Sequence, residues 1–344
     1  MKVVELTTWY SPHVGGVEQY VERISQELRS MGCDVEIFTL TKSKQDNVRS
    51  LRHLRIPRIP EWIGLLPSPS ILDRVLKSSA DLVHAHAYGY SLAWVAAAAK
   101  KLSKIPFVFT THSDPHSRIY PIYDFGRAIP IKACDMLIAN TRYEAARLCR
   151  IGADPSKIRV IPNGLDIGTP GPRPLDEPYI LCLGRVVFRQ KGQDLLLKAY
   201  DGTRLLQKLV FAGDGPDLPK LRSLATGNSN IIFLGPVYGD QKWTWLAHAD
   251  LVVIPSRTES FGLVALEAAA MRTRVVATRV GGLQYAAGQS SVLAEPNPTS
   301  LSEAICQALG KNTPLTPMDL TSQSWKRVAE ELLEVFREVV KKRD

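Results

Sequence analysis

Cysteine is scarce and unpatterned in this chain of 344 residues. There are five cysteines, and no two of them have the C-x-x-C spacing of a zinc ribbon or a thioredoxin-like redox site. Most lie in apolar runs, where a cysteine is usually a small buried hydrophobe. We therefore expect a reducing compartment and no structural zinc. The five are Cys33, Cys134, Cys149, Cys182 and Cys306.

Long apolar runs are absent as well. The longest, Leu92–Ala99, is far shorter than the roughly 20 residues that a helix needs to cross a bilayer. The chain opens on a strand pattern, Met1–Leu6, and lacks the apolar region of a secretory signal peptide. These absences predict a cytoplasmic protein that is soluble or, at most, associated with the cytoplasmic face of a membrane.

Two ligand-binding patterns are also missing. No Gly-x-Gly-x-x-Gly follows the first strand pattern, which argues against a dinucleotide-dependent dehydrogenase. No carboxylate–histidine cluster shows the spacing of a metal site, so we expect no metal ion. The formal net charge of +9 favours anionic partners such as nucleotides, phosphates or acidic membrane surfaces.

Strand patterns alternate with helix patterns along the whole chain, which predicts parallel sheets covered on both faces. A segment rich in proline and glycine, Ile167–Pro178, interrupts the alternation and indicates a linker. The expected strands are Val3–Thr7, Val35–Leu40, Leu82–Ala85, Phe107–Thr110, Met136–Ala139 and Ile158–Ile161 before the linker, and Tyr179–Leu183, Leu209–Ala212, Ile231–Leu234, Leu251–Ile254, Val275–Thr278 and Val292–Leu293 after it.

We therefore predict an α/β protein of two Rossmann-like, doubly wound domains that face a cleft. The predicted domains are residues 1–165 and 166–324, in keeping with about 150 residues per domain. A last helix, within residues 325–344, lies beyond the second sheet and can pack back on the first domain. Ligands of such folds bind at the carboxyl ends of the strands, so the loops there should carry the chemistry.

The most informative of these loops is Glu259–Glu267, which follows an apolar strand and enters the helix-forming run Ala265–Met271. The first glutamate falls in the turn, and the second falls about two turns into the helix. Between them lie the N–H groups of a helix N-terminus, which form a ready anion site. A phosphate with a carboxylate on either side fits a nucleotide sugar, whose hydroxyls can donate to both, and fits a nucleic acid poorly.

Two cations follow the first strand of the second domain. Arg185 comes directly after Gly184, and Lys191 directly precedes Gly192. Together they can clamp a diphosphate and stabilise the charge that develops as it leaves. Either residue alone would more simply be a solvated loop cation. Arg189 between them is the more natural bystander, although it could substitute for one of the pair.

Four further loop motifs face the predicted cleft. The pair Gly15-Gly16 precedes the first helix and lets backbone approach a phosphate, but a plain turn is equally consistent. Gly213 opens a turn that could close near the ligand, although a turn with no ligand contact is the simpler interpretation. Val237 follows the next strand and could bring main-chain groups to a base edge. His112 could contact sugar or acceptor, with a structural role equally open.

Two more histidines, His84 and His86, end a strand of the first domain. At least one of them is expected only to fill space between sheet and helix.

In type and order, these residues resemble the retaining glycosyltransferases of the GT-B fold, family 4 (glycosyl transferases group 1). The resemblance covers nearly the whole chain, and its most specific part is the Glu-x7-Glu motif in a Ser-Phe-Gly-Leu context. The matching features are Gly15-Gly16 with Glu18, Thr111-His112, Asn163-Gly164-Leu165-Asp166, Gly184-Arg185 with Lys191-Gly192, Gly213-Asp214-Gly215-Pro216, Leu234-Gly235, Glu259-x7-Glu267 and Gly281-Gly282.

The resemblance implies that a hexose-type sugar moves from a UDP- or GDP-sugar to a glycan, lipid or small-molecule acceptor, with retention at the anomeric carbon. It implies that Arg185 and Lys191 bind the diphosphate, that Glu259 binds the sugar hydroxyls, and that Glu267 binds the ribose. It places donor binding in the second domain and acceptor binding in the first. It also implies a metal-independent reaction with no cofactor, in which a donor phosphate oxygen takes the acceptor's proton.

Further donor contacts are implied by the same resemblance. The N–H groups at the start of the helix are expected to meet the distal phosphate. The glycine pair of the first domain is expected to meet the diphosphate, and His112 the sugar. The residues concerned are Gly15, Gly16, Ser260, Phe261, Gly262, Leu263 and Val264.

The segment Arg49–Leu66 interleaves basic and apolar residues, with an arginine at every third position from Arg49 to Arg58. We predict that it meets an anionic acceptor or an anionic membrane surface. A solvated loop edge with a few core residues is the simpler alternative.

Two other functions stay open. A nucleotide-sugar epimerase shares the architecture, but the Glu259-x7-Glu267 motif in its context favours a transferase. A catalytically silent nucleotide-sugar-binding subunit is the other, and the intact pair Arg185 and Lys191 argues against it.

Overall fold

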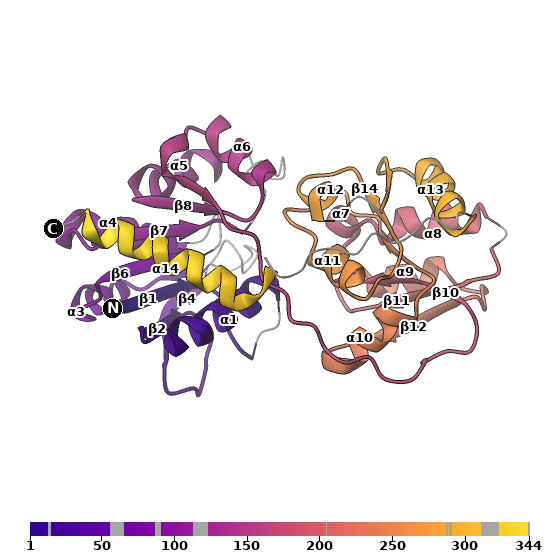
Figure 1. Cartoon of the computed structure of the whole chain (residues 1–344), viewed down its shortest axis with the longest axis horizontal. Coiled ribbons are helices and arrows are strands. Elements are labelled where there is room, and N and C mark those ends of the chain that lie inside the picture. The colour runs from indigo at the N-terminus through magenta and orange to yellow at the C-terminus, as the bar shows by residue number, and fades with distance from the viewer. Residues whose placement is uncertain are drawn as a thin grey trace. The chain divides into compact units, whose positions relative to one another are not determined.

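The computed structural model describes residues 1–12, 15–55, 65–86, 91–112, 123–203, 205–286, 288, 291–310 and 323–342. The chain divides into two compact units (Figure 1). The first unit is Met1–Gly164 together with Ser322–Asp344, and the second is Leu165–Thr321.

The first unit is built on a sheet of seven strands, all parallel to their neighbours. The strands are β1 (Lys2–Thr7), β2 (Asp34–Thr39), β3 (Val48–Ser50), β6 (Leu82–His86), β7 (Phe107–Thr110), β8 (Met136–Ala139) and β9 (Ile158–Val160). Their order across the sheet is β3-β2-β1-β6-β7-β8-β9. Parallel neighbours need crossover connections, and these place helices on both faces.

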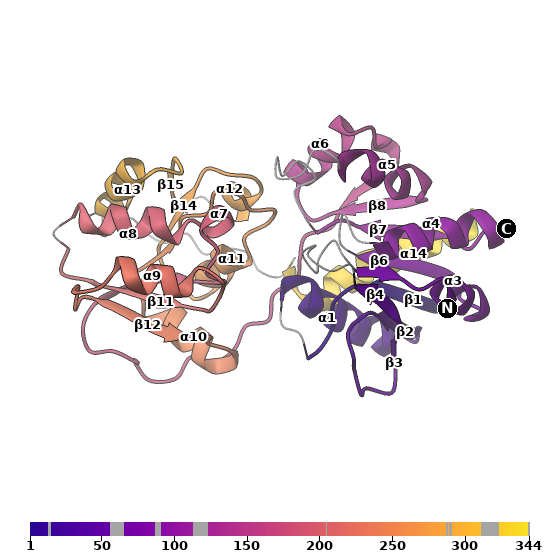
Figure 2. The same ribbon diagram turned by 180° about the vertical axis from the view of Figure 1, so that it is seen from behind.

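Helices α1 (Gly16–Ser30) and α14 (Trp325–Lys341) cover one face of this sheet, and both views show them side by side (Figures 1 and 2). In α1, Tyr20, Ile24 and Leu28 recur at helical spacing and supply its buried stripe. The opposite face carries α3 (Ser70–Lys77), α4 (Ser91–Ser103), α5 (Tyr123–Ala133) and α6 (Arg142–Arg150), with a short 3-10 turn, η1 (Pro155–Lys157), before β9.

Three short strands between residues 48 and 67 escaped the sequence patterns. Besides β3, they are β4 (His53–Arg55) and β5 (Leu65–Pro67), which pair antiparallel with each other. Three residues are too few to show an alternation. Within the predicted basic segment Arg49–Leu66, Arg49 lies 3.7 Å from the carboxylate of Glu36, and Leu51 is buried. Residues 56–64 lie outside the described residues, so the membrane or acceptor role stays a prediction.

The second unit is built on six parallel strands. They are β10 (Tyr179–Leu183), β11 (Lys208–Ala212), β12 (Ile231–Gly235), β13 (Leu251–Ile254), β14 (Val275–Thr278) and β15 (Val292–Ala294). Their order is β12-β11-β10-β13-β14-β15. One face is covered by α10 (Gly239–His248), α11 (Leu263–Ala270) and α12 (Leu283–Ala286), and the other by α8 (Gln193–Asp201), α9 (Leu218–Leu224) and α13 (Pro298–Gly310). A further short helix, α7 (Phe188–Lys191), follows β10.

The prediction of two doubly wound, Rossmann-like parallel sheets is confirmed. Across the described ranges, no helix is long and apolar enough to traverse a bilayer. The cysteines are all free, and Cys33, Cys134 and Cys182 are buried as expected, whereas Cys149 and Cys306 are exposed.

Candidate active site

The second sheet reverses its strand order between β10 and β13, and ligands of doubly wound sheets bind beyond the carboxyl ends of the strands at such a point. The loop after β10 carries Arg185 and leads into α7, whose last residue is Lys191. The loop after β13 carries Glu259 and leads into α11. The topology thus brings Arg185 and Lys191 to one edge together with Glu259, which lies far from them in the sequence.

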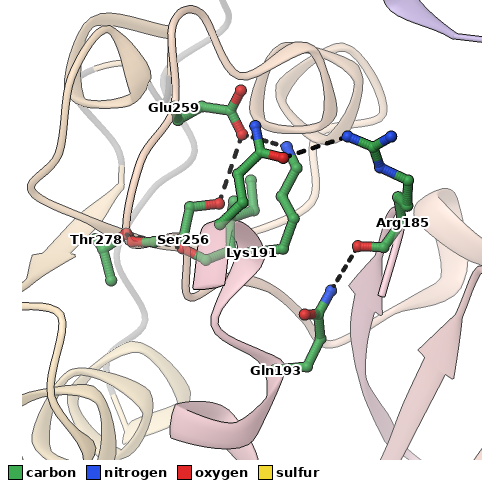
Figure 3. A network of polar contacts seen from close by, with 8 residues as sticks. Arg185, Lys191, Gln193, Ser256, Glu259 and Thr278 are labelled. Carbon is green, nitrogen blue, oxygen red and sulfur yellow. Dashed lines mark hydrogen bonds and ion pairs between the residues drawn. The ribbon is translucent and has the colours of Figure 1, made fainter. Parts of the chain in front are cut away.

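Lys191 and Glu259 form an ion pair in which Lys191 Nζ lies 2.5 Å from Glu259 Oε2 (Figure 3). Ser256 Oγ lies 3.5 Å from the same carboxylate oxygen, and Thr278 Oγ1 donates to the Ser256 carbonyl at 2.6 Å. The side chains of the pair are 27% and 14% exposed, so a ligand can reach both charges.

Arg185 lies beside this pair. Its Nη2 donates to Gln190 Oε1 at 3.3 Å, and its carbonyl accepts from Gln193 Nε2 at 2.9 Å. The guanidinium and the Lys191 ammonium both extend toward the side on which the Glu259 carboxylate lies (Figure 3). Arg185 is exposed and makes no ion pair with any carboxylate in the described ranges, so its charge is available to an anion. Arg189 is exposed too.

Arg257 ties the loop that carries Glu259 to the helices that follow β10. Its guanidinium donates twice to the Asp194 carboxylate, at 2.6 and 2.8 Å, and its N–H donates to the Gln190 carbonyl at 2.8 Å. Burial would raise the pKa of Asp194, but hydrogen bonds and charge from Arg257 lower it instead. Sequence reasoning missed this brace, because neither residue lies in a recognisable motif.

Two glycines allow these loops to approach closely. Gly192 has φ +65°, and a Cβ there would lie 2.1 Å from the Pro255 carbonyl oxygen. Gly281 has φ +51°, and a Cβ there would lie 1.8 Å from the Glu259 carbonyl oxygen, which also accepts from the Gly282 N–H at 3.0 Å. Because backbone atoms form both obstacles, a side chain at either position would displace the loop that holds Glu259.

Helix α11 begins at Leu263, directly after Gly262. The Gly262 carbonyl accepts from the Ala265 N–H at 3.0 Å and from the Leu266 N–H at 3.4 Å. The N–H groups of Leu263 and Val264 come too early in the helix for an intrahelical acceptor and can meet an anion. The turn after β13 thus supplies partial positive charge as well as the Glu259 carboxylate.

Glu267 is the fifth residue of α11, so it lies about one turn into the helix, and the expected two turns were wrong. The step of eight residues from Glu259 to Glu267 would span two turns only in a continuous helix, and the helix begins at Leu263. Glu267 is 6% exposed, and Lys242 Nζ on α10 donates to its Oε1 at 2.7 Å. Burial raises the pKa of Glu267, and Lys242 opposes that effect. No motif around Lys242 could have revealed this partner.

Three other predicted donor-binding residues have defined places in the second unit. The Gly213 N–H donates to the Gly235 carbonyl at 2.7 Å and closes the turn after β11. Val237 and Phe261 are 6% and 9% exposed and belong to the apolar core under α10 and α11. Their main-chain groups are therefore what a ligand could meet. Ser260, Leu263 and Val264 are partly exposed.

In the first unit, Gly15 precedes α1, and its carbonyl accepts from the Gln19 N–H at 3.1 Å in the first turn, which starts at Gly16. His112 follows β7 with φ +54°, an uncommon conformation for a residue other than glycine. Its Nε2 lies 3.0 Å from His86 Nδ1, and its Nδ1 lies 3.2 Å from Asn140 Nδ2.

The first sheet also assembles a buried carboxylate–histidine cluster. Glu5 on β1 pairs in register with His84 on β6, and Glu5 Oε2 lies 2.9 Å from His84 Nδ1 and 2.5 Å from His86 Nε2. One potential ligand atom from each of these fully buried residues lies within 4.8 Å of the others. The sequence-based statement that no such cluster exists was wrong, because spacing along one segment cannot show a group assembled from two strands.

Both histidines of this cluster are hydrogen-bonded. His84 Nε2 lies 2.7 Å from Thr110 Oγ1, and His86 contacts Glu5 and His112. At least one of them was expected to fill space between sheet and helix, and His84 does pack against Phe336 of α14 in addition to its hydrogen bonds. The alternation His84-x-His86 on one strand, with Glu5 on the neighbouring first strand, was the signal that could have found the cluster.

Comparison with known proteins covers both units. Residues 14–169 match the family described as Glycosyltransferase Family 4, and residues 177–311 match Glycosyl transferases group 1. The D-inositol 3-phosphate glycosyltransferase of Xylanimonas cellulosilytica is 33% identical over 329 residues, which cover 78% of this chain and 76% of that protein.

Solved structures share the fold. Anabaena HepE, crystallised with UDP and glucose, has a TM-score of 0.79 at 18% identity, covering 98% of this chain and 100% of that one. Sucrose-phosphate synthase of Thermosynechococcus elongatus has a TM-score of 0.80 at 20% identity, covering 99% of each chain.

The matched ranges contain the elements assembled above, His112 in the first and the Arg185–Lys191–Glu259 edge in the second. The chain belongs to glycosyltransferase family 4, the glycosyl transferases group 1, and it is a glycosyltransferase that moves a sugar from a nucleotide sugar.

Proposed function

We propose that this chain is a retaining hexosyltransferase that takes its sugar from a UDP- or GDP-sugar and needs no divalent metal. The observation that supports this most is the grouping of Arg185 and Lys191 with Glu259 at the edge where α11 begins. Two cations there can neutralise the charge that develops on the departing diphosphate, which a bound metal ion would otherwise do.

The Lys191–Glu259 pair gives the proposed mechanism its first step. When the donor binds, Lys191 exchanges the carboxylate for the diphosphate, and the released Glu259 accepts hydrogen bonds from sugar hydroxyls. Arg185 turns to the same diphosphate, and the N–H groups of Leu263 and Val264 meet its distal phosphate. The bond between the anomeric carbon and the phosphate oxygen then breaks, the acceptor oxygen bonds to the same face of that carbon, and a donor phosphate oxygen takes the acceptor's proton.

Glu267 is proposed to hold the ribose. An ionised carboxylate accepts hydrogen bonds from two neighbouring hydroxyls, and Lys242 counters the burial that would otherwise favour its neutral form. For the first unit, the family resemblance assigns Gly15 and Gly16 to the diphosphate and His112 to the sugar, and these roles stay predictions.

The names of the similar proteins suggest the first substrates to test. UDP and glucose were present in the Anabaena structure, and the Xylanimonas relative is named for D-inositol 3-phosphate. We therefore propose UDP-glucose as the first donor to test and a phosphorylated cyclitol as the first small-molecule acceptor. Glycan and lipid acceptors follow.

A thermal-shift panel of UDP, GDP and their sugars tests the donor class. A ligand that binds only the folded chain stabilises it by about 2.7 kcal/mol at a hundred times its dissociation constant. We expect one base to stabilise the protein clearly more than the other. No shift with any uridine or guanosine diphosphate sugar would contradict the proposal, and isomerisation of the bound sugar without transfer would favour the epimerase.

A further inference from the structure

A chain of hydrogen bonds runs through the interior of the first unit and ends at His112. Glu5 Oε2 lies 2.5 Å from His86 Nε2, His86 Nδ1 lies 3.0 Å from His112 Nε2, and His112 Nδ1 lies 3.2 Å from Asn140 Nδ2. Glu5 and His86 are fully buried, and Asn140 is 4% exposed. The links come from β1, β6 and the loops after β7 and β8.

We propose that Glu5 and His86 are positioning residues that hold His112 as one neutral tautomer, with Nε2 protonated and Nδ1 an acceptor. The inference deepens the proposed function and rests on it for the contact between His112 and the donor sugar. A sugar hydroxyl would then donate to His112 Nδ1 in place of the Asn140 amide.

The direction of each bond follows from the donors and acceptors present. An ionised carboxylate only accepts, so His86 Nε2 carries a proton and donates to Glu5. A neutral imidazole has one donor and one acceptor, so His86 Nδ1 accepts from His112 Nε2, which leaves His112 Nδ1 as an acceptor. The Asn140 amide agrees, because its NH2 group faces the ring while its Oδ1 has no partner within the described residues.

The surroundings favour these charge states. Burial would raise the pKa of Glu5, but the charges and hydrogen bonds of His84 and His86 lower it to about 2. Burial lowers the pKa of His86 to about 4, with His84 adding to the effect and Glu5 opposing it. Burial and the two other histidines lower the pKa of His112 well below its usual value.

Packing locks the rings in place. Tyr20 of α1 meets His112 edge-on at 4.5 Å between ring centroids, and His86 stacks on His112 at 5.3 Å. From α14, Trp325 packs on Tyr20 and Phe336 packs on His84. Tyr20 is itself titratable, and Glu144 of α6 is a further titratable group among the described residues, which accepts from the Thr111 hydroxyl. Turning the His112 ring would break its hydrogen bonds to His86 and Asn140.

A divalent metal ion at Glu5, His84 and His86 is the competing use of these groups. It would need an unprotonated His86 Nε2, so Nδ1 would carry the proton and His112 would become a donor at Nδ1. The two arrangements therefore predict opposite tautomers of His112.

The test uses the whole protein with 15N-labelled histidine rings and long-range proton–nitrogen NMR, with signals assigned from His86→Gln and His112→Gln. We expect both rings to be protonated at Nε2 and not at Nδ1, unchanged between pH 5.5 and 8, with no stoichiometric metal by elemental analysis. Protonated His112 Nδ1, a titrating ring in that range or one bound metal per chain would overturn the proposal.

Glu5→Gln tests positioning, because its amide can donate to His86 and reverse the chain without changing shape. We expect His112 Nδ1 to become protonated and kcat/KM with the established donor to fall at least tenfold. Thr110→Val is the matched control, since it removes a hydroxyl that contacts His84 and Tyr20 but forms no link between Glu5, His86, His112 and Asn140, and it should change neither. If the spectrum of Glu5→Gln shows that the hydrogen bonds have reversed but kcat/KM is unchanged, the positioning role of Glu5 is overturned.

The tautomer of His112 and its effect on catalysis can be tested separately. If Glu5→Gln does not fold, the spectrum of the unaltered protein still decides the tautomer. If no donor is turned over, the proposed function fails while the spectrum still tests the chain.

Discussion

Each unit places a cluster of one carboxylate and basic side chains where its sheet reverses strand order. The cluster of the first unit and the cluster of the second differ in exposure to solvent. In the second unit, Lys191 and Glu259 are 27% and 14% exposed. In the first, Glu5, His84 and His86 are fully buried. A partly exposed pair can exchange one partner for a ligand at modest cost, whereas a buried charge needs its partners at all times. The comparison suggests that one group grips the substrate and the other holds a side chain in place.

The largest effect is expected from variants that remove a cation from the exposed cluster of the second unit. Lys191→Ala and Arg185→Ala should each remove about 3 kcal/mol of transition-state stabilisation, which is on the order of a hundredfold in kcat/KM. Steady-state kinetics with the best donor measures it, and Arg189→Ala, which removes an exposed cation from the same helix, should stay within about twofold. Near-normal turnover in both variants would refute the diphosphate clamp.

Lys242→Ala probes a pair of intermediate exposure, since Lys242 and Glu267 are 20% and 8% exposed. The change leaves a buried carboxylate without its cation, so we expect a loss of about 2 kcal/mol in the free energy of unfolding, less than for a fully buried pair. Urea unfolding measures the loss, and adding Glu267→Gln should restore most of it. If Lys242→Ala alone is as stable as the parent, the Lys242–Glu267 pair contributes little to the free energy of unfolding.

Substitution of Glu259 and substitution of Glu267 should change the affinities for two ligands differently. Glu259→Ala should weaken binding of the nucleotide sugar by about 1.5 kcal/mol, roughly the value of a hydrogen bond to a charged group, and leave the free nucleoside diphosphate nearly unchanged. Glu267→Ala should weaken both ligands similarly, because the ribose is common to them. Calorimetry measures both, and equal behaviour of the two variants would remove the assigned division of roles.

The smallest effect concerns the buried group and pH. The pKa of His86 is about 4 in the folded chain, below its usual 6.5, so the unfolded chain binds the proton more readily. Stability contributed by neutral His86 is therefore complete above pH 6.5 and is lost as pH falls toward 4. The lowered pKa of Glu5, about 2, keeps its contribution until pH falls below about 4.5.

Urea midpoints measured between pH 7 and 4.5 test this. The decline should be shallower in His86→Gln than in the parent and unchanged in His53→Gln, which alters an exposed histidine. Parallel declines in all three would assign the acid sensitivity to other groups.

The fold was predictable because every long strand carries a continuous apolar run and every crossover a helical pattern. The edge with Arg185, Lys191 and Glu259 was predictable for a related reason, since each residue follows a strand end. Lys242 and the Arg257–Asp194 brace were not, because they lie on helix faces and a loop without a pattern and are brought in only by packing. The Glu5–His84–His86 cluster needed the pairing of β1 with β6, which spacing within either segment does not contain.

Donor hydrolysis without acceptor, in the presence of a metal chelator, tests the central proposal most directly. The proposal predicts slow release of nucleoside diphosphate, reduced on the order of a hundredfold by Lys191→Ala, with the free sugar first appearing by NMR in the anomeric configuration of the donor. Tight donor binding with no release, an inverted sugar or a strict requirement for added metal would contradict it.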